Sequence, residues 1–257
     1  MAKYDTPSDI RPLEKLILDF SYANGYDPLN VFNDFLTYII HGFSSGAPPL
    51  HSWKYKRQQN ATFMEMVKEW IQLMNRKLQD DKAWFDPFGD LYMSLVSQGT
   101  QQGHGQFFTP VHICDLMVMC TGGEEKTNGG RMNDPTCGSG RLLLAYHVQN
   151  LGNFLVGEDI NYTCCLMTVC NMLIHGCVGE VVWHDSLDPK NFMGGWKVNP
   201  ILTRTGIPTI RKMSLEEYQA SRNLPLSPYT AARKFPSEDR RARKTHGSFP
   251  RQTVLNM

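Results

Sequence analysis

The sequence lacks the features of a membrane or secreted protein. No apolar run reaches the roughly 18 residues that a membrane-spanning helix needs. The opening MAKYDTPSDI has no apolar core of a signal peptide. We see no internal repeat, and none of the seven cysteines forms a Cys-x-x-Cys pair of the kind that binds zinc. We therefore expect a cytoplasmic chain with free buried thiols and with neither a metal nor a membrane partner.

Net charge is also small, at +1 over 257 residues, but it is unevenly distributed. Residues 201–257 hold 11 Lys and Arg against 4 Asp and Glu, whereas residues 1–200 hold 15 against 21. A basic terminal region is typical of chains that bind a polyanion such as DNA. A region that only keeps the chain soluble has the same composition, so charge alone leaves both interpretations open.

Apolar periodicity predicts helices in the first hundred residues. Residues 9–22 and 30–43 carry helical patterns, and a more regular one follows Asn60, a candidate N-cap. The apolar positions of that third segment are Phe63, Val67, Trp70, Ile71, Met74 and Leu78. We therefore predict a helical N-terminal subdomain over residues 1–104.

Helical and strand patterns alternate from residue 110 onward. After the helix VHICDLMVMC come the strand RMND, a glycine turn with a helix, the strand NFLVGED, a helix capped by Asn161, and the strand GEVVWHD. This β-α-β-α-β order is typical of a parallel sheet with helices on its faces. The fold class predicted for residues 105–200 is therefore α/β and Rossmann-like. Residues 201–257 are interpreted as a basic, partly ordered extension.

The glycine turn DPTCGSG follows the first of these strands. Gly138 and Gly140 allow a tight turn and let the backbone approach a ligand that a Cβ atom would exclude. Many such turns hold no ligand, so the turn alone is weak support for a binding site.

Two acids strengthen the case for a ligand at this turn. Asp159 ends the second strand, 19 residues after Gly140, where a carboxylate can accept hydrogen bonds from a ribose diol. Asp185 ends the third strand, where an acceptor can read the edge of an adenine ring. Each acid could instead only cap the next turn. Together with the glycine turn, they predict a nucleoside-shaped site at the strand ends.

The motifs in this region resemble those of a known family. In order along the chain they are GQFFTP (105–110), NDPTCGSGRLLLA (133–145), GEDIN (157–161), NMLIHG (171–176) and HDSL (184–187). They resemble the N6-adenine DNA methyltransferases, in particular the methylation subunits of type I restriction-modification systems. The resemblance runs from about Asp90 to Pro200.

The resemblance implies S-adenosylmethionine as the cofactor. By position, the methionine end would be lined by Phe107, Phe108, Thr109 and Pro110. The floor of the site would be formed by Asp134, Pro135, Gly138 and Gly140, with Asp134 facing the amino group. Asp159 would hold the ribose, and Asp185 would hold the adenine.

The catalytic loop of this family departs from its pattern here. The family carries Asn/Asp-Pro-Pro-aromatic at the end of the fourth strand, where it accepts the hydrogens of the target amine and stacks on the flipped base. In this chain Asn199 and Pro200 are followed by Ile201 and Leu202, and the preceding NFMGGWKV is unlike an apolar strand. Asn199 and Pro200 are the candidate catalytic residues, and an incidental Asn-Pro turn is the alternative.

The resemblance implies site-specific methylation of adenine N6 in DNA, of the restriction-modification type, with DNA as a partner. A separate specificity subunit is a further candidate partner, since only 57 residues follow Pro200. The alternative is a catalytically inactive, cofactor-binding relative that associates with DNA as an accessory or regulatory protein. Residues 199–202 distinguish the two hypotheses.

Overall fold

The computed structural model describes residues 6–44, 46–47, 54–79, 83–98, 108–121 and 129–222. The chain divides into two compact units, Met1–Ser214 and Leu215–Met257. The described part of the second unit is the helix α9 (Leu215–Arg222). All other elements belong to the first unit, which carries the candidate site. The boundaries proposed at residues 104 and 200 stay predictions.

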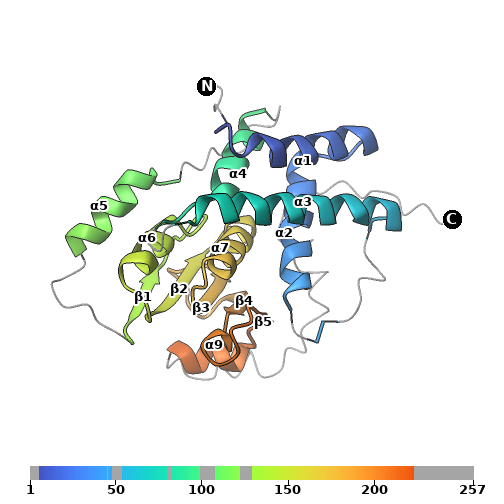
Figure 1. Ribbon diagram of the computed structural model, residues 1–257. Helices are drawn as coiled ribbons and strands as arrows, with labels where there is room; N and C mark the ends of the chain where they lie inside the picture. The colour runs from blue at the N-terminus through green and yellow to red at the C-terminus, as the bar shows by residue number, and fades with distance from the viewer. Residues whose placement is uncertain are drawn as a thin grey trace. The chain divides into compact units, whose positions relative to one another are not determined.

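In the described residues four helices precede the alternating region (Figure 1). The apolar periodicity predicts the first three of them, and the fourth was not predicted. They are α1 (Arg11–Asn24), α2 (Pro28–Gly42), α3 (Arg57–Lys77) and α4 (Pro87–Gln98). The Asp27 side chain caps α2 by accepting a hydrogen bond from the Asn30 N–H at 3.0 Å. Asn60 is not a cap, because α3 already begins at Arg57. The aromatic rings of Phe35, Trp70 and Phe88 are fully buried between these helices.

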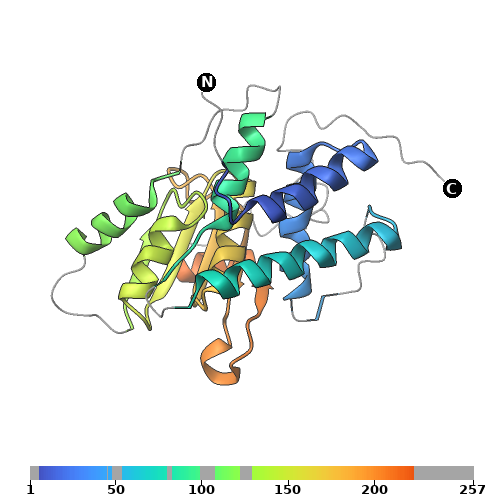
Figure 2. The same cartoon turned by 45° about the horizontal axis from the view of Figure 1, so that its top comes forward.

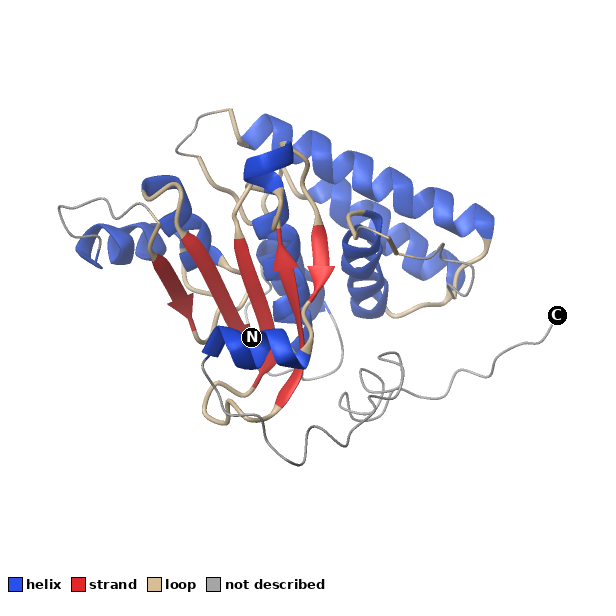
Figure 3. Ribbon diagram, turned by 90° about the horizontal axis from the view of Figure 1, so that it is seen from below, coloured by secondary structure: helices blue, strands red, loops and turns tan. Residues whose placement is uncertain are grey.

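In the part of the chain that the structure describes, the sheet has five strands in the order β1-β2-β3-β4-β5, which Figure 3 shows side by side. They are β1 (Arg131–Asp134), β2 (Phe154–Asp159), β3 (Gly179–His184), β4 (Phe192–Val198) and β5 (Ile210–Lys212). The first three strands are parallel, as predicted. β4 and β5 are antiparallel to their neighbours, so the sheet is mixed and the expectation of a parallel sheet holds for β1–β3 alone.

Helices α5 (Val111–Thr121), α6 (Arg141–Gln149) and α7 (Tyr162–Ile174) accompany the parallel strands (Figures 1 and 2). The Asn161 side chain caps α7 as predicted, accepting hydrogen bonds from the N–H groups of Thr163 and Cys164. α7 also packs against α2, so one continuous apolar core joins the helical region to the sheet. Since apolar burial is the main stabilising term in folding, the sheet and the helices stabilise each other.

The cysteines of α7 lie in this core, as their helical setting predicts. Cys164, Cys165 and Cys170 are buried, and burial raises the pKa of each thiol. Cys120 departs from the expectation of buried thiols, because it is exposed at the end of α5. None of the described helices combines the length and apolar character that crossing a bilayer requires.

Candidate functional site

The carboxyl ends of β1, β2 and β3 meet at one edge of the sheet because the three strands are parallel. The strand register puts Asp134 opposite Gly157 and Asp159 opposite Trp183. Asp185 directly follows β3. Three of the predicted acids are therefore brought to the same edge, from segments that are separate in the sequence.

The glycine turn lies between β1 and α6 and is tied to β2. The Gly138 N–H donates to the Asp159 carboxylate at 2.9 Å, and the Cys137 N–H donates to the Glu158 carbonyl at 2.9 Å. Gly138 and Gly140 have φ angles of +56° and +91°, in the region that glycine adopts without strain. A Cβ atom on Gly138 would also come within 2.9 Å of the Phe108 ring. The turn thus needs glycine for its conformation and for the close approach of Phe108.

Asp134 and Asp159 are largely buried, each with 8% of its surface exposed. Desolvation raises the pKa of both carboxyls, and backbone N–H donors partly offset this shift. The negative charge of Asp159 adds to the rise in the pKa of Asp134. Two acids whose charges repel at a partly desolvated edge favour a ligand that brings a positive charge or hydroxyl donors.

Other predicted residues border the same edge. Thr109 and Pro110 are exposed and Phe108 is half-buried, while Phe107 lies outside the described residues. The Pro135 carbonyl accepts a hydrogen bond from the Ser186 hydroxyl at 2.5 Å, which joins the loops after β1 and β3. Asp185 is half-buried, and its carboxylate accepts the Leu187 N–H at 2.9 Å.

Sequence reasoning did not select two apolar residues at this edge. Ile160, directly after Asp159, is 63% exposed, and Leu187, two residues after Asp185, is 94% exposed. The Ile160 backbone is held in place, because its carbonyl accepts the Trp183 indole N–H at 3.0 Å. Such side chains offer an apolar surface to a flat ring. An apolar residue directly after a strand-end acid is the signal that could have found Ile160.

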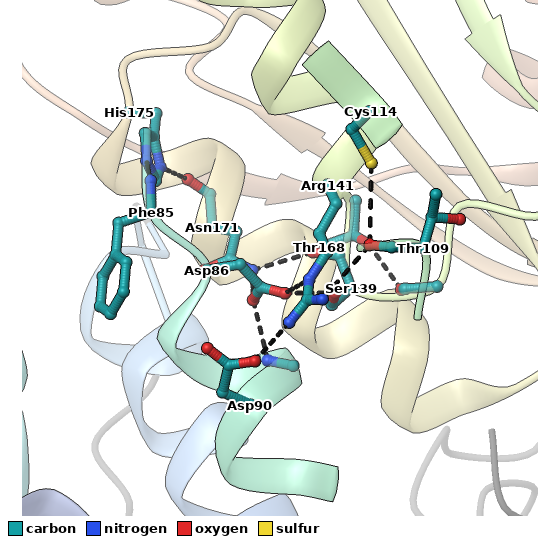
Figure 4. A network of polar contacts seen from close by, with 12 residues as sticks. Phe85, Asp86, Asp90, Thr109, Cys114, Ser139, Arg141, Thr168, Asn171 and His175 are labelled. Atoms are coloured by element: carbon teal, nitrogen blue, oxygen red, sulfur yellow. Dashed lines mark hydrogen bonds and ion pairs between the residues drawn. The ribbon is translucent and has the colours of Figure 1, made fainter. Parts of the chain in front are cut away.

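A buried network of hydrogen bonds and ion pairs connects the glycine turn to the helical region (Figure 4). The Asp86 carboxylate, just before α4, accepts hydrogen bonds from the Ser139 hydroxyl at 2.6 Å and the Arg141 guanidinium at 2.7 Å. It also accepts the Asn171 amide at 2.7 Å and the Gly89 N–H at 2.8 Å. One carboxylate from the helical region therefore connects the glycine turn with helices α4, α6 and α7.

Arg141 extends this network to the segment that carries Phe108. Its guanidinium donates to the Asp90 carboxylate at 2.6 Å and to the Thr109 carbonyl at 3.3 Å, and it lies over the Phe108 ring. Burial disfavours its charge, but the carboxylates of Asp86 and Asp90 outweigh burial and raise its pKa. Arg141 thus fixes the position of the 108–110 segment relative to the glycine turn.

Disrupting this ion pair should destabilise the fold. Asp86→Ala and Arg141→Ala should each lower the free energy of unfolding by about 3 kcal/mol or more, because each removes a buried partner of opposite charge. Asp86→Ala leaves Arg141 with Asp90 alone, and Arg141→Ala leaves the buried Asp86 carboxylate without its cation. The double variant should lose less than the sum of the two, since neither charge then remains alone. Urea unfolding measures all three values, and strictly additive losses would contradict the coupling.

The structure contradicts the prediction that Asn199 and Pro200 are catalytic. β4 runs antiparallel to β3, with Val198 opposite Gly179 at the beginning of β3. Asn199 and Pro200 therefore lie beside the amino end of β3, whereas Asp134, Asp159 and Asp185 lie at the carboxyl ends of β1, β2 and β3. A methyl group moves only between atoms held a few ångströms apart, so a pair at the opposite edge could not act on an amine placed beside a cofactor at the predicted site.

The Asn199 side chain is fully buried and already bonded. Its amide N–H groups donate to the carbonyls of Leu173 at 3.2 Å and Cys177 at 2.9 Å, and its oxygen accepts the Thr209 N–H at 3.2 Å. Its φ of +53° is one that asparagine tolerates better than most residues. The Asn-Pro pair is thus a structural turn that satisfies carbonyls at the end of α7, which is the alternative left open by the sequence.

Substituting Asn199 should therefore affect stability rather than ligand binding. Asn199→Ala should lower the free energy of unfolding by about 2 kcal/mol, because buried carbonyls lose their donor. Asn199→Gly should cost somewhat less, since glycine adopts the positive φ without strain. Urea unfolding checks both variants. A loss of methyl transfer at unchanged stability would contradict the structural role.

Comparison with known proteins agrees with the motifs at this edge. Residues 84–205 match the family model described as N-6 DNA Methylase. The match confirms the resemblance found in the sequence. It begins two residues before Asp86, so the polar network lies inside the matched segment.

A curated methylase and a solved structure are also similar to the chain. It is 32% identical over 122 residues to the type I restriction enzyme MpnII methylase subunit of Mycoplasma pneumoniae, covering 43% of this chain and 22% of that protein. It thus spans about a fifth of the relative's length. A type I restriction-modification methyltransferase subunit from Streptococcus thermophilus is 24% identical with a TM-score of 0.38, over 73% of this chain and 42% of that one.

Proposed function

We propose that this chain binds S-adenosylmethionine and takes part in site-specific methylation of adenine N6 in DNA, of the restriction-modification type. The observation that carries the proposal is the meeting of the glycine turn with Asp134, Asp159 and Asp185 at the carboxyl edge of β1–β3. The methylase match over residues 84–205 supports the reaction class, since a methylase needs a methyl donor.

The residues at this edge suit the proposed cofactor. The Asp159 oxygens accept the backbone N–H groups of Gly138 and Asn161, and a carboxylate has further lone pairs that can accept a ribose hydroxyl. Asp134 offers a buried carboxylate to the cofactor's amino group. Asp185 and the exposed Ile160 side chain would border the adenine ring. When bound, S-adenosylmethionine supplies the methyl group.

The chain's own residues would also position the methionine end. Arg141 holds the Thr109 carbonyl and covers the Phe108 ring, so the 108–110 segment stays beside the glycine turn. The carboxylates are placed before any ligand arrives, because backbone N–H groups already orient Asp134 and Asp159. A preformed site lowers the entropic cost of binding.

The target adenine needs a second set of groups. Its amino nitrogen is a poor nucleophile, and acceptors for its hydrogens favour the reactive geometry. Asn199 and Pro200 do not provide them, because they lie at the opposite edge of the sheet. We propose that the acceptors come from other residues, and that DNA and a separate specificity subunit are partners. The word "subunit" in the relative's name agrees with an assembly.

The burial of Asn199 also favours a second candidate function. In this hypothesis the chain binds the cofactor and associates with DNA as an accessory or regulatory relative, without methyl transfer. The two candidates share the cofactor site and differ in whether any acceptor reaches the target amine.

Cofactor binding should depend on Asp159 and on pH. Asp159→Asn should weaken S-adenosylmethionine binding tenfold or more, because an amide is a poorer acceptor for the ribose hydroxyls than a carboxylate. Burial raises the pKa of Asp134 and Asp159 above 3.8, and the cofactor prefers their charged forms. As the pH decreases, affinity for the cofactor should therefore begin to fall at a pH above the pKa of an ordinary Asp carboxyl. Titration calorimetry checks both effects, with Asp188→Asn on the exposed loop as the control.

Methyl transfer tests the reaction itself. Purified chain, tritiated S-adenosylmethionine and mixed-sequence DNA should together yield label in N6-methyladenine if the chain and its bound DNA supply the acceptors. Cofactor binding without labelled adenine, at every salt concentration, would reject catalysis by the chain alone and favour the accessory candidate. Absence of cofactor binding would overturn both.

A further inference from the structure

The side chain of His175, the residue after α7, lies between two backbone groups (Figure 4). Its Nε2 atom accepts the Phe85 N–H at 3.2 Å, and its Nδ1 atom lies 2.7 Å from the Asn171 carbonyl oxygen. A backbone N–H can only donate and a carbonyl can only accept, so Nε2 must carry the lone pair and Nδ1 the proton. The two partners thus require a neutral imidazole with its proton on Nδ1.

The partners of His175 lead to the network around Asp86. Phe85 directly precedes Asp86, and the Asn171 side chain donates to the Asp86 carboxylate at 2.7 Å. The same amide donates to the Ser139 carbonyl of the glycine turn at 2.8 Å. The end of α7 therefore holds residue 85 through the His175 ring and residue 86 through the Asn171 amide.

The surroundings of the ring keep it neutral. The pKa of His175 is lowered to about 4, chiefly by burial and further by the nearby His147 of α6. The Asn171 carbonyl and the Asp86 carboxylate oppose this shift. A protonated ring would carry an N–H on both nitrogens, so the Phe85 N–H would lose its acceptor and face a second donor. Protonation of the ring and its hold on Phe85 therefore exclude each other.

We propose that His175 is a positioning residue of the cofactor site. Its neutral ring holds Phe85 and so keeps the Asp86 carboxylate at the glycine turn, where Ser139 donates to it. Protonation of the ring releases Phe85 and weakens cofactor binding. The inference rests on the proposed cofactor site and adds a proton-linked control of that site.

The control is indirect, because His175 lies far from the carboxyl edge of β1–β3. Asn161 caps the beginning of α7 beside that edge, and His175 follows the end of the same helix. The 13 residues of α7 separate the two positions by about 20 Å, at 1.5 Å per residue. The ring therefore acts through the position of Asp86 and not through contact with the ligand. Proton and cofactor are then linked reciprocally, so each weakens the binding of the other by the same factor.

Two amide variants separate the acceptor of the ring from its donor. In His175→Gln the side-chain oxygen reaches the place of Nε2 and accepts the Phe85 N–H without titrating. In His175→Asn the shorter side chain reaches only the place of Nδ1, so the Phe85 N–H loses its acceptor. Calorimetry with S-adenosylhomocysteine near neutral pH should find the affinity of His175→Gln within about twofold of wild type and that of His175→Asn about tenfold or more weaker.

The two variants also serve as controls for each other. Circular dichroism checks that both are folded at the temperature of the titration. A purely structural role of the ring predicts equal cofactor affinity for the two folded variants, and that result overturns the proposal.

Nuclear magnetic resonance of the wild-type chain with isotope-labelled histidine needs no variant. Long-range proton–nitrogen spectra should show His175 with its proton on Nδ1 and with a pKa of about 4. Saturating S-adenosylhomocysteine should lower this pKa by about one unit, which corresponds to tenfold weaker binding to the protonated form. A proton on Nε2, or a pKa that the ligand leaves unchanged, overturns the proposal even if His175→Asn does not fold.

Failure of this inference can be separated from failure of the proposed function. Calorimetric binding of S-adenosylhomocysteine by the wild-type chain, with an unchanged pKa of His175, rejects only the positioning role. Absence of that binding rejects the proposed cofactor site itself, and the inference with it.

Discussion

The Asp86 carboxylate is the group on which the candidate site depends most. It is almost fully buried and accepts hydrogen bonds from the glycine turn, α4, α6 and α7. A buried carboxylate is costly unless every such partner is present, so the four segments are held in one arrangement. Through Arg141 the same arrangement fixes the 108–110 segment. The helical region thus positions the glycine turn that would hold the cofactor.

Most of the cofactor edge could be predicted from the sequence because its signals are local. Each signal is contained in a short stretch of sequence: an acid at a strand end, a glycine turn, or an Asn cap. Parallel pairing of the strands then brings their carboxyl ends together. Asp134, Asp159 and Asp185 meet at one edge for this reason. The support behind the turn was not predicted, since Asp86 and Arg141 are 55 residues apart and only the folded chain brings them together. Whether the edge holds S-adenosylmethionine stays a proposal.

The prediction for Asn199 was wrong for a different reason. The motif suggested a loop after a parallel fourth strand, but local sequence does not determine strand direction. The short loop 185–191 brings the chain straight back along β3 as a hairpin, whereas a parallel neighbour needs a long crossover. Antiparallel pairing moves residue 199 to the other edge, where its amide satisfies carbonyls at the end of α7. In the described residues the strand order also leaves β1 at the outer side of the sheet.

The central claim is that the carboxyl edge of β1–β3 binds S-adenosylmethionine. A crystal structure of the chain grown with S-adenosylhomocysteine, the demethylated product, tests it most directly. The account predicts the ribose hydroxyls at Asp159, the amino group at Asp134 and the adenine between Ile160 and Asp185. An empty edge at saturating ligand, or the ligand bound near Asn199, would contradict it.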